Sequence, residues 1–266
     1  MDLGLRDRVA IVMAASKGLG RACAAALAAE GALVTIGARG AQALEKTAQE
    51  IQQATGSRVL AVPTDVTRAE DVEAIVVATV REFGRIDILV NNAGGPPAGK
   101  FESFGDAQWQ ATFELNLLST VRLVRLVLPH IRKTGSGRII NIVSTSVKQP
   151  IDGLLLSNAI RSGVVGLAKT LSVELAPDNI TVNNVCPGRI LTDRFRQIYH
   201  INDRAQQGAS EEAVLKEMAQ TQGIPMGRIG KPEELGAFVA FLASQQAAYI
   251  TGTTTQIDGG LVRSLL

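Results

Sequence analysis

Residues 9–30 read VAIVMAASKGLGRACAAALAAE, and this stretch decides the fold. Its first part, Val9–Ala14, is apolar without polar alternation, which is typical of a strand buried on both faces. The run leads into a turn of small residues with Gly18 and Gly20, and the residue spacing over Arg21–Glu30 then predicts a helix. A strand, a glycine turn and a helix N-terminus favour an anion site, because free amide N–H groups and the helix dipole face the ligand. A plain tight turn is the alternative.

Strand and helix patterns continue to alternate along the chain. Further strands are expected at Leu33–Ala38, Arg58–Pro63, Ile86–Val90, Arg138–Val143, Thr181–Val185 and Thr254–Ile257, and further helices at Ala41–Thr55, Ala69–Phe83, Asp106–Thr134, Ser157–Leu175 and Pro232–Ala243. Such repeated units imply right-handed crossovers. The chain is therefore predicted to be an α/β protein, a Rossmann-like, doubly wound parallel sheet of about seven strands with helices on both faces. No linker or low-complexity segment divides it, so we expect a single domain over residues 1–266.

One segment, 193–223, interrupts this rhythm with mostly polar residues between a strand and a helix. A stretch of this length without a strand is usually functional. We expect a helical lid over a substrate site, with an inert surface insertion as the alternative. Arg189, Arg194 and Arg196 lie near its start, but exposed arginines are common and weigh little towards an anionic substrate.

The composition excludes several classes of function. Apolar residues make up 46% of the chain, and 27 basic against 25 acidic residues leave a net charge of +2, which gives no electrostatic signature for nucleic acid or an anionic membrane. Cys23 and Cys186 are too few for a disulfide framework, and no metal site is expected. No window reaches the roughly 18 apolar residues of a membrane span, and no signal peptide is visible. A cytoplasmic location is therefore expected.

The end of the second predicted strand bears on the cofactor. It reads Gly37-Ala38-Arg39-Gly40, without an acidic residue. An NAD site usually places a carboxylate there to accept from the ribose 2′-hydroxyl. Arg39, with Lys17, favours instead the 2′-phosphate of NADP through charge-assisted hydrogen bonds. NAD remains the alternative if both cations are only solvated surface residues.

Over essentially its whole length, the sequence resembles the short-chain dehydrogenase/reductase family, and within it the acyl-carrier-protein-reductase-like branch. The motifs that carry the resemblance are Gly18-Leu19-Gly20, Asp65-Val66, Asn91-Asn92-Ala93-Gly94, Asn116, Ser144, Pro187-Gly188 with Thr192, Ile250-Thr251-Gly252 and Asp258-Gly259-Gly260. The resemblance implies hydride transfer between a nicotinamide cofactor and a small carbonyl or alcohol substrate. It also implies a homodimer or homotetramer.

Cofactor contacts follow from the same resemblance. Asp65 would accept a hydrogen bond from the adenine amino group, and Pro187, Gly188 and Thr192 would meet the nicotinamide carboxamide. The full set of expected cofactor-binding residues is Ala14, Ser16, Lys17, Gly18, Leu19, Gly20, Arg39, Asp65, Val66, Asn92, Ala93, Gly94, Pro187, Gly188 and Thr192.

Two positions depart from the family pattern. The leading glycine of the first turn falls on Ala14, whose methyl narrows the approach to the pyrophosphate but fits if its φ stays negative. The family's catalytic pattern is Ser, a Tyr thirteen residues later and a Lys four beyond it. Asn116 and Ser144 match, but the Tyr position is Ser157 and the Lys position is Arg161. We take these four residues as the catalytic set.

This change affects the proton donor. A serine hydroxyl is a much weaker acid than a phenol, and Arg161 stays protonated and cannot relay a proton. Three stand-ins are open: a water held by Ser157, Lys148, or the adjacent pair Tyr199 and His200, for which lid packing is the alternative.

Three functions remain open. The first is an NADP-dependent oxidoreductase with a non-standard proton donor. The second is a dinucleotide-binding protein that has lost the reaction and acts as a sensor or assembly partner. The third is a lyase or isomerase that uses the same pocket, because the residue that would hold a carbonyl, Ser144, is present.

Overall fold

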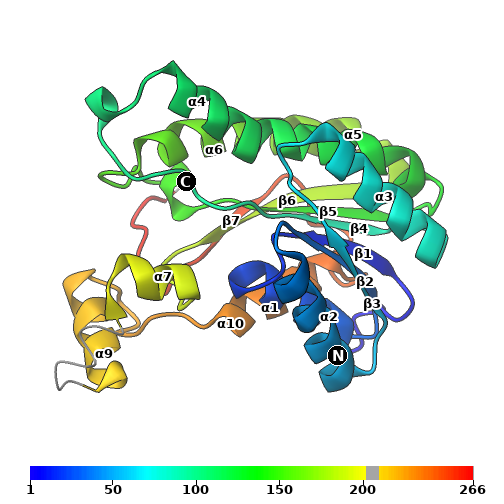
Figure 1. The fold of residues 1–266 in the computed structure, drawn as a ribbon, viewed down its shortest axis with the longest axis horizontal. Coiled ribbons are helices and arrows are strands. Elements are labelled where there is room, and N and C mark those ends of the chain that lie inside the picture. Colours follow the sequence, from blue (N-terminus) through cyan, green and yellow to red (C-terminus); the bar gives the residue numbers. More distant parts are fainter. Residues whose placement is uncertain (202–209, 266) are drawn as a thin grey trace.

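A seven-stranded parallel sheet runs through the computed structural model, which describes residues 1–201 and 210–265 (Figure 1). The strands are β1 Val9–Met13, β2 Leu33–Ala38, β3 Val59–Pro63, β4 Ile88–Asn91, β5 Gly137–Ile142, β6 Ile180–Pro187 and β7 Thr254–Ile257. They are ordered β3-β2-β1-β4-β5-β6-β7, and every neighbouring pair is parallel. The predicted doubly wound parallel sheet is confirmed.

Helices cover both faces of this sheet (Figure 1). One face carries α1 Gly18–Ala29, α2 Ala41–Thr55 and α10 Pro232–Ala243, and the other carries α3 Ala69–Phe83, α4 Asp106–Phe113, α5 Ser119–Arg132 and α6 Leu155–Glu174. The central strand β1 shows why its sequence lacks polar alternation. Val12 packs into the core on the α1 side, whereas Ile11 and Met13 pack into the core on the α3 side. Each strand residue is therefore buried whichever way it points.

The stretch predicted as one helix over Asp106–Thr134 is divided. Between α4 and α5 lies a π-helical segment, η2 Glu114–Leu118, and Asn116 is within it. The extra residue per turn re-aims the side chains in such a segment, and π-helical turns occur frequently at functional sites. Helix α1 begins at Gly18, before the predicted Arg21, because the glycine turn itself forms the first helical turn.

The segment after β6 is helical, as predicted. It contains α7 Asp193–Ile198 and α9 Glu211–Thr221, which project beside the sheet (Figure 1), while its residues 202–209 lie outside the described residues. The side chains that give this projection its own apolar cluster are Phe195, Ile201, Val214, Met218, Ala219, Ile224 and Ile229. Within residues 1–201 and 210–265, no helix is both long and apolar enough to cross a membrane.

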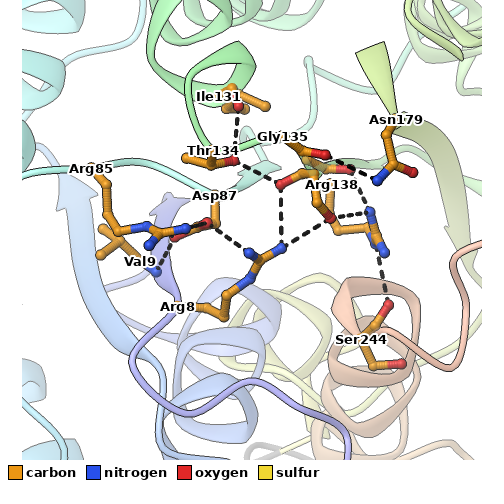
Figure 2. A network of polar contacts seen from close by, with 12 residues as sticks. Arg8, Val9, Arg85, Asp87, Ile131, Thr134, Gly135, Arg138, Asn179 and Ser244 are labelled. Carbon is orange, nitrogen blue, oxygen red and sulfur yellow. Dashed lines mark hydrogen bonds and ion pairs between the residues drawn. The ribbon is translucent and has the colours of Figure 1, made fainter. Parts of the chain in front are cut away.

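A polar network joins the amino ends of the central strands (Figure 2). Asp87, which precedes β4, has no exposed surface, and its carboxylate accepts from Val9 N at 2.9 Å and from Arg85 Nη2 at 2.6 Å. Arg8 Nη1 lies 3.0 Å from the same carboxylate. Arg138, in β5, is likewise fully buried, and its Nε donates to Ser244 O at 3.2 Å. The network ties β1, β4 and β5 together at the edge opposite the carboxyl ends of the strands.

Candidate active site

The carboxyl ends of β1 and β4 are neighbours at the point where the strand order reverses. In sheets of this kind the ligand crevice lies outside the carboxyl ends of the strands at such a point. Asn92, which directly follows β4, donates from its Nδ2 to Met13 O at the end of β1, at 3.3 Å. This contact closes the floor of the crevice between the two strands.

The glycine turn after β1 fits a pyrophosphate. Gly18 has φ +58°, and a Cβ built on Gly20 would lie 2.4 Å from Ala14 O, so no side chain is possible at Gly20 without a shift of the backbone. No side chain caps the amino end of α1 at Lys17, which leaves its first N–H groups to a ligand. A Cβ on Gly18 would lie 3.5 Å from the Thr192 methyl group. The turn after β1 thus meets the residue that we expect at the nicotinamide.

Thr192 is held in place by its own helix. Its Oγ1 accepts a hydrogen bond from Phe195 N at 3.2 Å and so caps α7. Because that oxygen acts as the acceptor, its hydroxyl proton remains available for a ligand carbonyl. The geometry suits the carboxamide contact that the family resemblance implies.

The backbone at Ala14 does not meet the condition for an unstrained alanine. That condition is a negative φ, and the structure has φ +48°. The physical reason is the close approach of Gly20 to Ala14 O, which fixes the backbone of the turn in the left-handed region. In the left-handed region, a residue other than glycine destabilises the folded state by about 1–2 kcal/mol.

We therefore predict that Ala14→Gly stabilises the protein. Relief of about 1–2 kcal/mol of strain outweighs the roughly 0.4–1 kcal/mol that a glycine adds to the entropy of the unfolded chain. Urea unfolding should show a gain of about 0.5–1 kcal/mol, and NADPH titration should show tighter binding. Ala15→Gly is the matched control and should destabilise, because Ala15 is fully buried and its φ is not positive. A loss of stability in both variants would contradict the prediction.

Arg39 and Asp65 lie together at the ends of β2 and β3. The Thr67 backbone N–H, which donates to Asp65 Oδ1 at 3.0 Å, is the main cause of the lowered pKa of Asp65. The charge of Arg39 lowers the same pKa further. Asp65 is therefore ionised and can accept from an amino group, while Arg39 is exposed beside it. The amino end of α2, which follows Gly40, has no side-chain cap either.

Three serine hydroxyls gather after β5. Ser144 Oγ accepts from Ser146 N at 3.1 Å, which leaves the hydroxyl proton of Ser144 free to donate. The Ser146 and Ser157 hydroxyls are 3.3 Å apart, and Ser157 is only 6% exposed. The short helix η3 Thr145–Val147 brings Ser146 into this position. Sequence reasoning missed Ser146 because only the fold of this turn places it against Ser157.

Arg161 and Asn116 meet at the loop after β4. Arg161 is 7% exposed, and its Nη1 and Nη2 donate to Ile142 O and Ala93 O, each at 3.2 Å. Asn116 Nδ2 donates to Gly94 O at 2.9 Å, and its buried Oδ1 has no hydrogen-bond partner. Both side chains line a cavity of about 10 Å³, which is room for roughly one water. Burial, with the nearby Arg194, lowers the pKa of Arg161 to about 10, so the guanidinium stays charged at neutral pH.

The other proton-donor candidates, Tyr199 with His200 and Lys148, lie on different elements of the fold. The Tyr199 ring packs on Phe195 with centroids 4.6 Å apart, inside the apolar cluster of the α7–α9 projection. This contact supports lid packing as its role, and the exposed His200 follows it in the chain. Lys148, at the end of η3, is half-buried and lies close enough to the Cys186 thiol to influence its pKa.

A ladder of asparagines also crosses the sheet from β4 to β7. Asn91 Nδ2 donates to Asn141 Oδ1 at 2.8 Å, and Asn141 Nδ2 donates to Asn184 Oδ1 at 2.9 Å. Asn184 in turn donates to Thr254 Oγ1 at 3.1 Å. Sequence reasoning did not assign Asn141 and Asn184 to the site region. The recurrence of Asn near the ends of apolar runs was the available signal.

Known proteins resemble this chain over nearly its full length. The model of the family described as enoyl-(acyl carrier protein) reductase matches residues 13–262. The chain belongs to the short-chain dehydrogenase/reductase family. Among its relatives, the 3-oxoacyl-acyl-carrier-protein reductase FabG of Vibrio cholerae is 37% identical over 259 residues, which are 97% of this chain and 99% of the relative.

Solved structures of the family share the architecture. The L-sorbose reductase of Gluconobacter frateurii, in complex with NADPH and L-sorbose, superposes with a TM-score of 0.93 at 35% identity and full coverage of both chains. The NADPH-bound short chain oxidoreductase of Pseudomonas aeruginosa PAO1, which contains an atypical catalytic center, has a TM-score of 0.89 at 32% identity and 97% coverage of each chain.

Proposed function

We propose that this protein is an NADP(H)-dependent oxidoreductase that transfers a hydride between the nicotinamide and a carbonyl or alcohol substrate, with a proton donor other than tyrosine. The observation that carries the proposal is the meeting of Gly18 with Thr192, which supports one crevice for the turn after β1 and the segment after β6. The relatives described above are reductases by name, and this favours the reductase over a protein that has lost the reaction.

The bound cofactor would supply the hydride. Arg39 and the uncapped amino end of α2 would hold the 2′-phosphate, the turn at Gly18 and Gly20 the pyrophosphate, and Asp65 the adenine amino group. Ser144 would donate a hydrogen bond from its hydroxyl to the substrate carbonyl oxygen and so fix its position, without giving up the proton.

We also propose that Ser157 and Arg161 stand in the positions of the family's Tyr and Lys. Their hydroxyl and guanidinium cannot act as that pair acts, because serine is too weak an acid and Arg161 is held on Ile142 O and Ala93 O. A water held by the Ser146 and Ser157 hydroxyls is the proposed immediate proton donor. The buried charge of Arg161 favours the oxyanion that forms on the substrate.

The cofactor assignment is tested by fluorescence titration with NADPH and NADH. We expect NADPH to bind about 10- to 100-fold more tightly than NADH, because hydrogen bonds to a charged group contribute about this much to affinity. Arg39→Ala should remove that preference, and Arg68→Ala, an exposed arginine paired with Glu70, is the matched control. Tighter binding of NADH would contradict the role of Arg39.

The reaction is tested by the absorbance of the reduced nicotinamide with ketones, aldehydes, quinones and β-keto thioesters. Turnover that Ser144→Ala reduces supports the proposal. Cofactor binding without turnover of any compound would instead support a dinucleotide-binding protein. The proposed lid and the dimer or tetramer stay predictions of the sequence.

A further inference from the structure

Two guanidinium groups from different helices reach the loop that follows β4. Arg161, from α6, donates from Nη2 to Ala93 O at 3.2 Å. Arg194, from α7, donates from Nη2 to Pro96 O at 3.4 Å, and a Cβ on Gly95 would lie 3.2 Å from that nitrogen. The two charges are close enough for Arg194 to lower the pKa of Arg161. The two cations therefore lie near each other at this loop.

In the described part of the chain, no acidic side chain pairs with either arginine. Within residues 1–201 and 210–265, neither arginine forms an ion pair, and neither does Lys148 nearby. The Cys186 thiol is near Lys148 and Arg161, but burial raises its pKa to about 12, so it carries no negative charge at neutral pH. Asp258 is a nearby negative charge that acts on the same thiol, but its carboxylate oxygens accept from Gly260 N and Val262 N, and it forms no ion pair with either arginine in the described part of the chain.

The other arginines near the start of this segment are engaged elsewhere. Arg196 Nη1 pairs with Glu211 Oε2 at 2.7 Å, and Arg189 Nε donates to Gln222 Oε1 at 3.0 Å. Arg194 alone of these three is directed to the loop beside Arg161, with one long backbone contact. The sequence alone gave these three arginines little weight as a sign of an anionic substrate. That remains so for Arg189 and Arg196, whereas the contacts of Arg194 make it a candidate for binding an anion.

We propose that the substrate carries a carboxylate in addition to its carbonyl or alcohol group, and that Arg194 binds this carboxylate while Ser144 holds the carbonyl oxygen. A guanidinium matches a carboxylate through two parallel N–H···O bonds, and a cluster of cations concentrates anions. The charges of Arg161 and Lys148 add to the attraction. This inference rests on the reductase activity proposed above.

Matched acids and esters test the proposal. Pyruvate, acetoacetate and levulinate are each compared with their methyl esters in NADPH oxidation assays. We expect kcat/KM to be about 10- to 100-fold higher for at least one acid than for its ester, the worth of hydrogen bonds to a charged group. Arg194→Gln should remove this preference.

Arg196→Gln is the control, because it removes the same charge from the same helix at a residue paired with Glu211. It should leave the acid preference intact. Esters turned over as well as acids by the native protein would overturn the proposal. So would a weaker NADPH affinity in Arg194→Gln with an unchanged acid preference, because Arg194 would then serve the cofactor's own phosphates.

A binding assay separates this proposal from the proposed function. The same acids and esters are titrated by calorimetry into the NADP⁺ complex. Binding of an acid that Arg194→Gln abolishes, without turnover, would support the carboxylate site and count against the reductase. Turnover of neutral ketones without any binding of acids would support the reductase and overturn the carboxylate site.

Discussion

Asp87→Ala should lower the free energy of unfolding by about 3–5 kcal/mol, the usual cost of removing one partner from a buried charged pair. The Asp87 carboxylate has no exposed surface and holds Arg85, Arg8 and Val9 N at the amino ends of β1 and β4 (Figure 2). Without it, Arg8 keeps only Ser136 as a partner and faces the buried guanidinium of Arg138 with no compensating charge. Urea unfolding followed by circular dichroism measures the loss.

An exposed pair provides the matched control. Arg58 and Glu82 are also in contact but both are largely in solvent, so Glu82→Ala should cost less than about 1 kcal/mol. Because the network lies at the edge opposite the crevice, folded Asp87→Ala should bind NADPH as the native protein does. A loss as small as that of Glu82→Ala would mean that backbone packing alone holds the three strands together.

The strands were predictable from sequence, and this network was not. The runs Val9–Ala14 and Leu33–Ala38 correspond to β1 and β2, because strands buried on both faces are mostly apolar. Asp87 and Arg138, in contrast, are isolated charges in the sequence and resemble ordinary surface residues. Their burial depends on which strand ends the sheet order brings together. The π-helical segment at Asn116 was missed for a related reason, since a π turn leaves no distinct residue pattern.

The candidate site was predictable at positions where the backbone admits only one type of residue. The glycine turn after β1 has the expected place because no other residue fits at Gly20. The backbone conformation of Ala14 could not be read from the sequence, because its φ is fixed by the packing of that same glycine and not by the preference of alanine. Ser146 was missed because its partner, Ser157, lies on the following helix. Arg194 was given little weight because its partner, Pro96 O, is distant in sequence. Contacts across the crevice need the folded chain.

The double variant Ser157→Tyr with Arg161→Lys is expected to raise kcat/KM for a ketone by about 10²- to 10⁴-fold, the usual contribution of a general acid. A phenol has a reference pKa near 10, which an adjacent ammonium can pull towards neutrality, whereas the serine hydroxyl offers no such acid. Ser157→Tyr alone should gain much less, because Arg161 is fixed on Ile142 O and Ala93 O and cannot adjust to a phenol. The two substitutions should therefore be non-additive, as neighbours in one network are.

The control for this gain is Ser162→Tyr with Arg161→Lys. Ser162 is exposed on the next position of α6, so this variant has the same composition but its phenol lies outside the crevice, and it should show no gain. The Ser146 hydroxyl, 3.3 Å from that of Ser157, must move to admit the ring, and circular dichroism checks that the fold survives. If the double variant folds and binds NADPH yet turns over no faster than its control, the carbonyl does not sit beside residue 157. The pocket would then hold its substrate elsewhere, and a water held by the Ser146 and Ser157 hydroxyls could not be the proton donor.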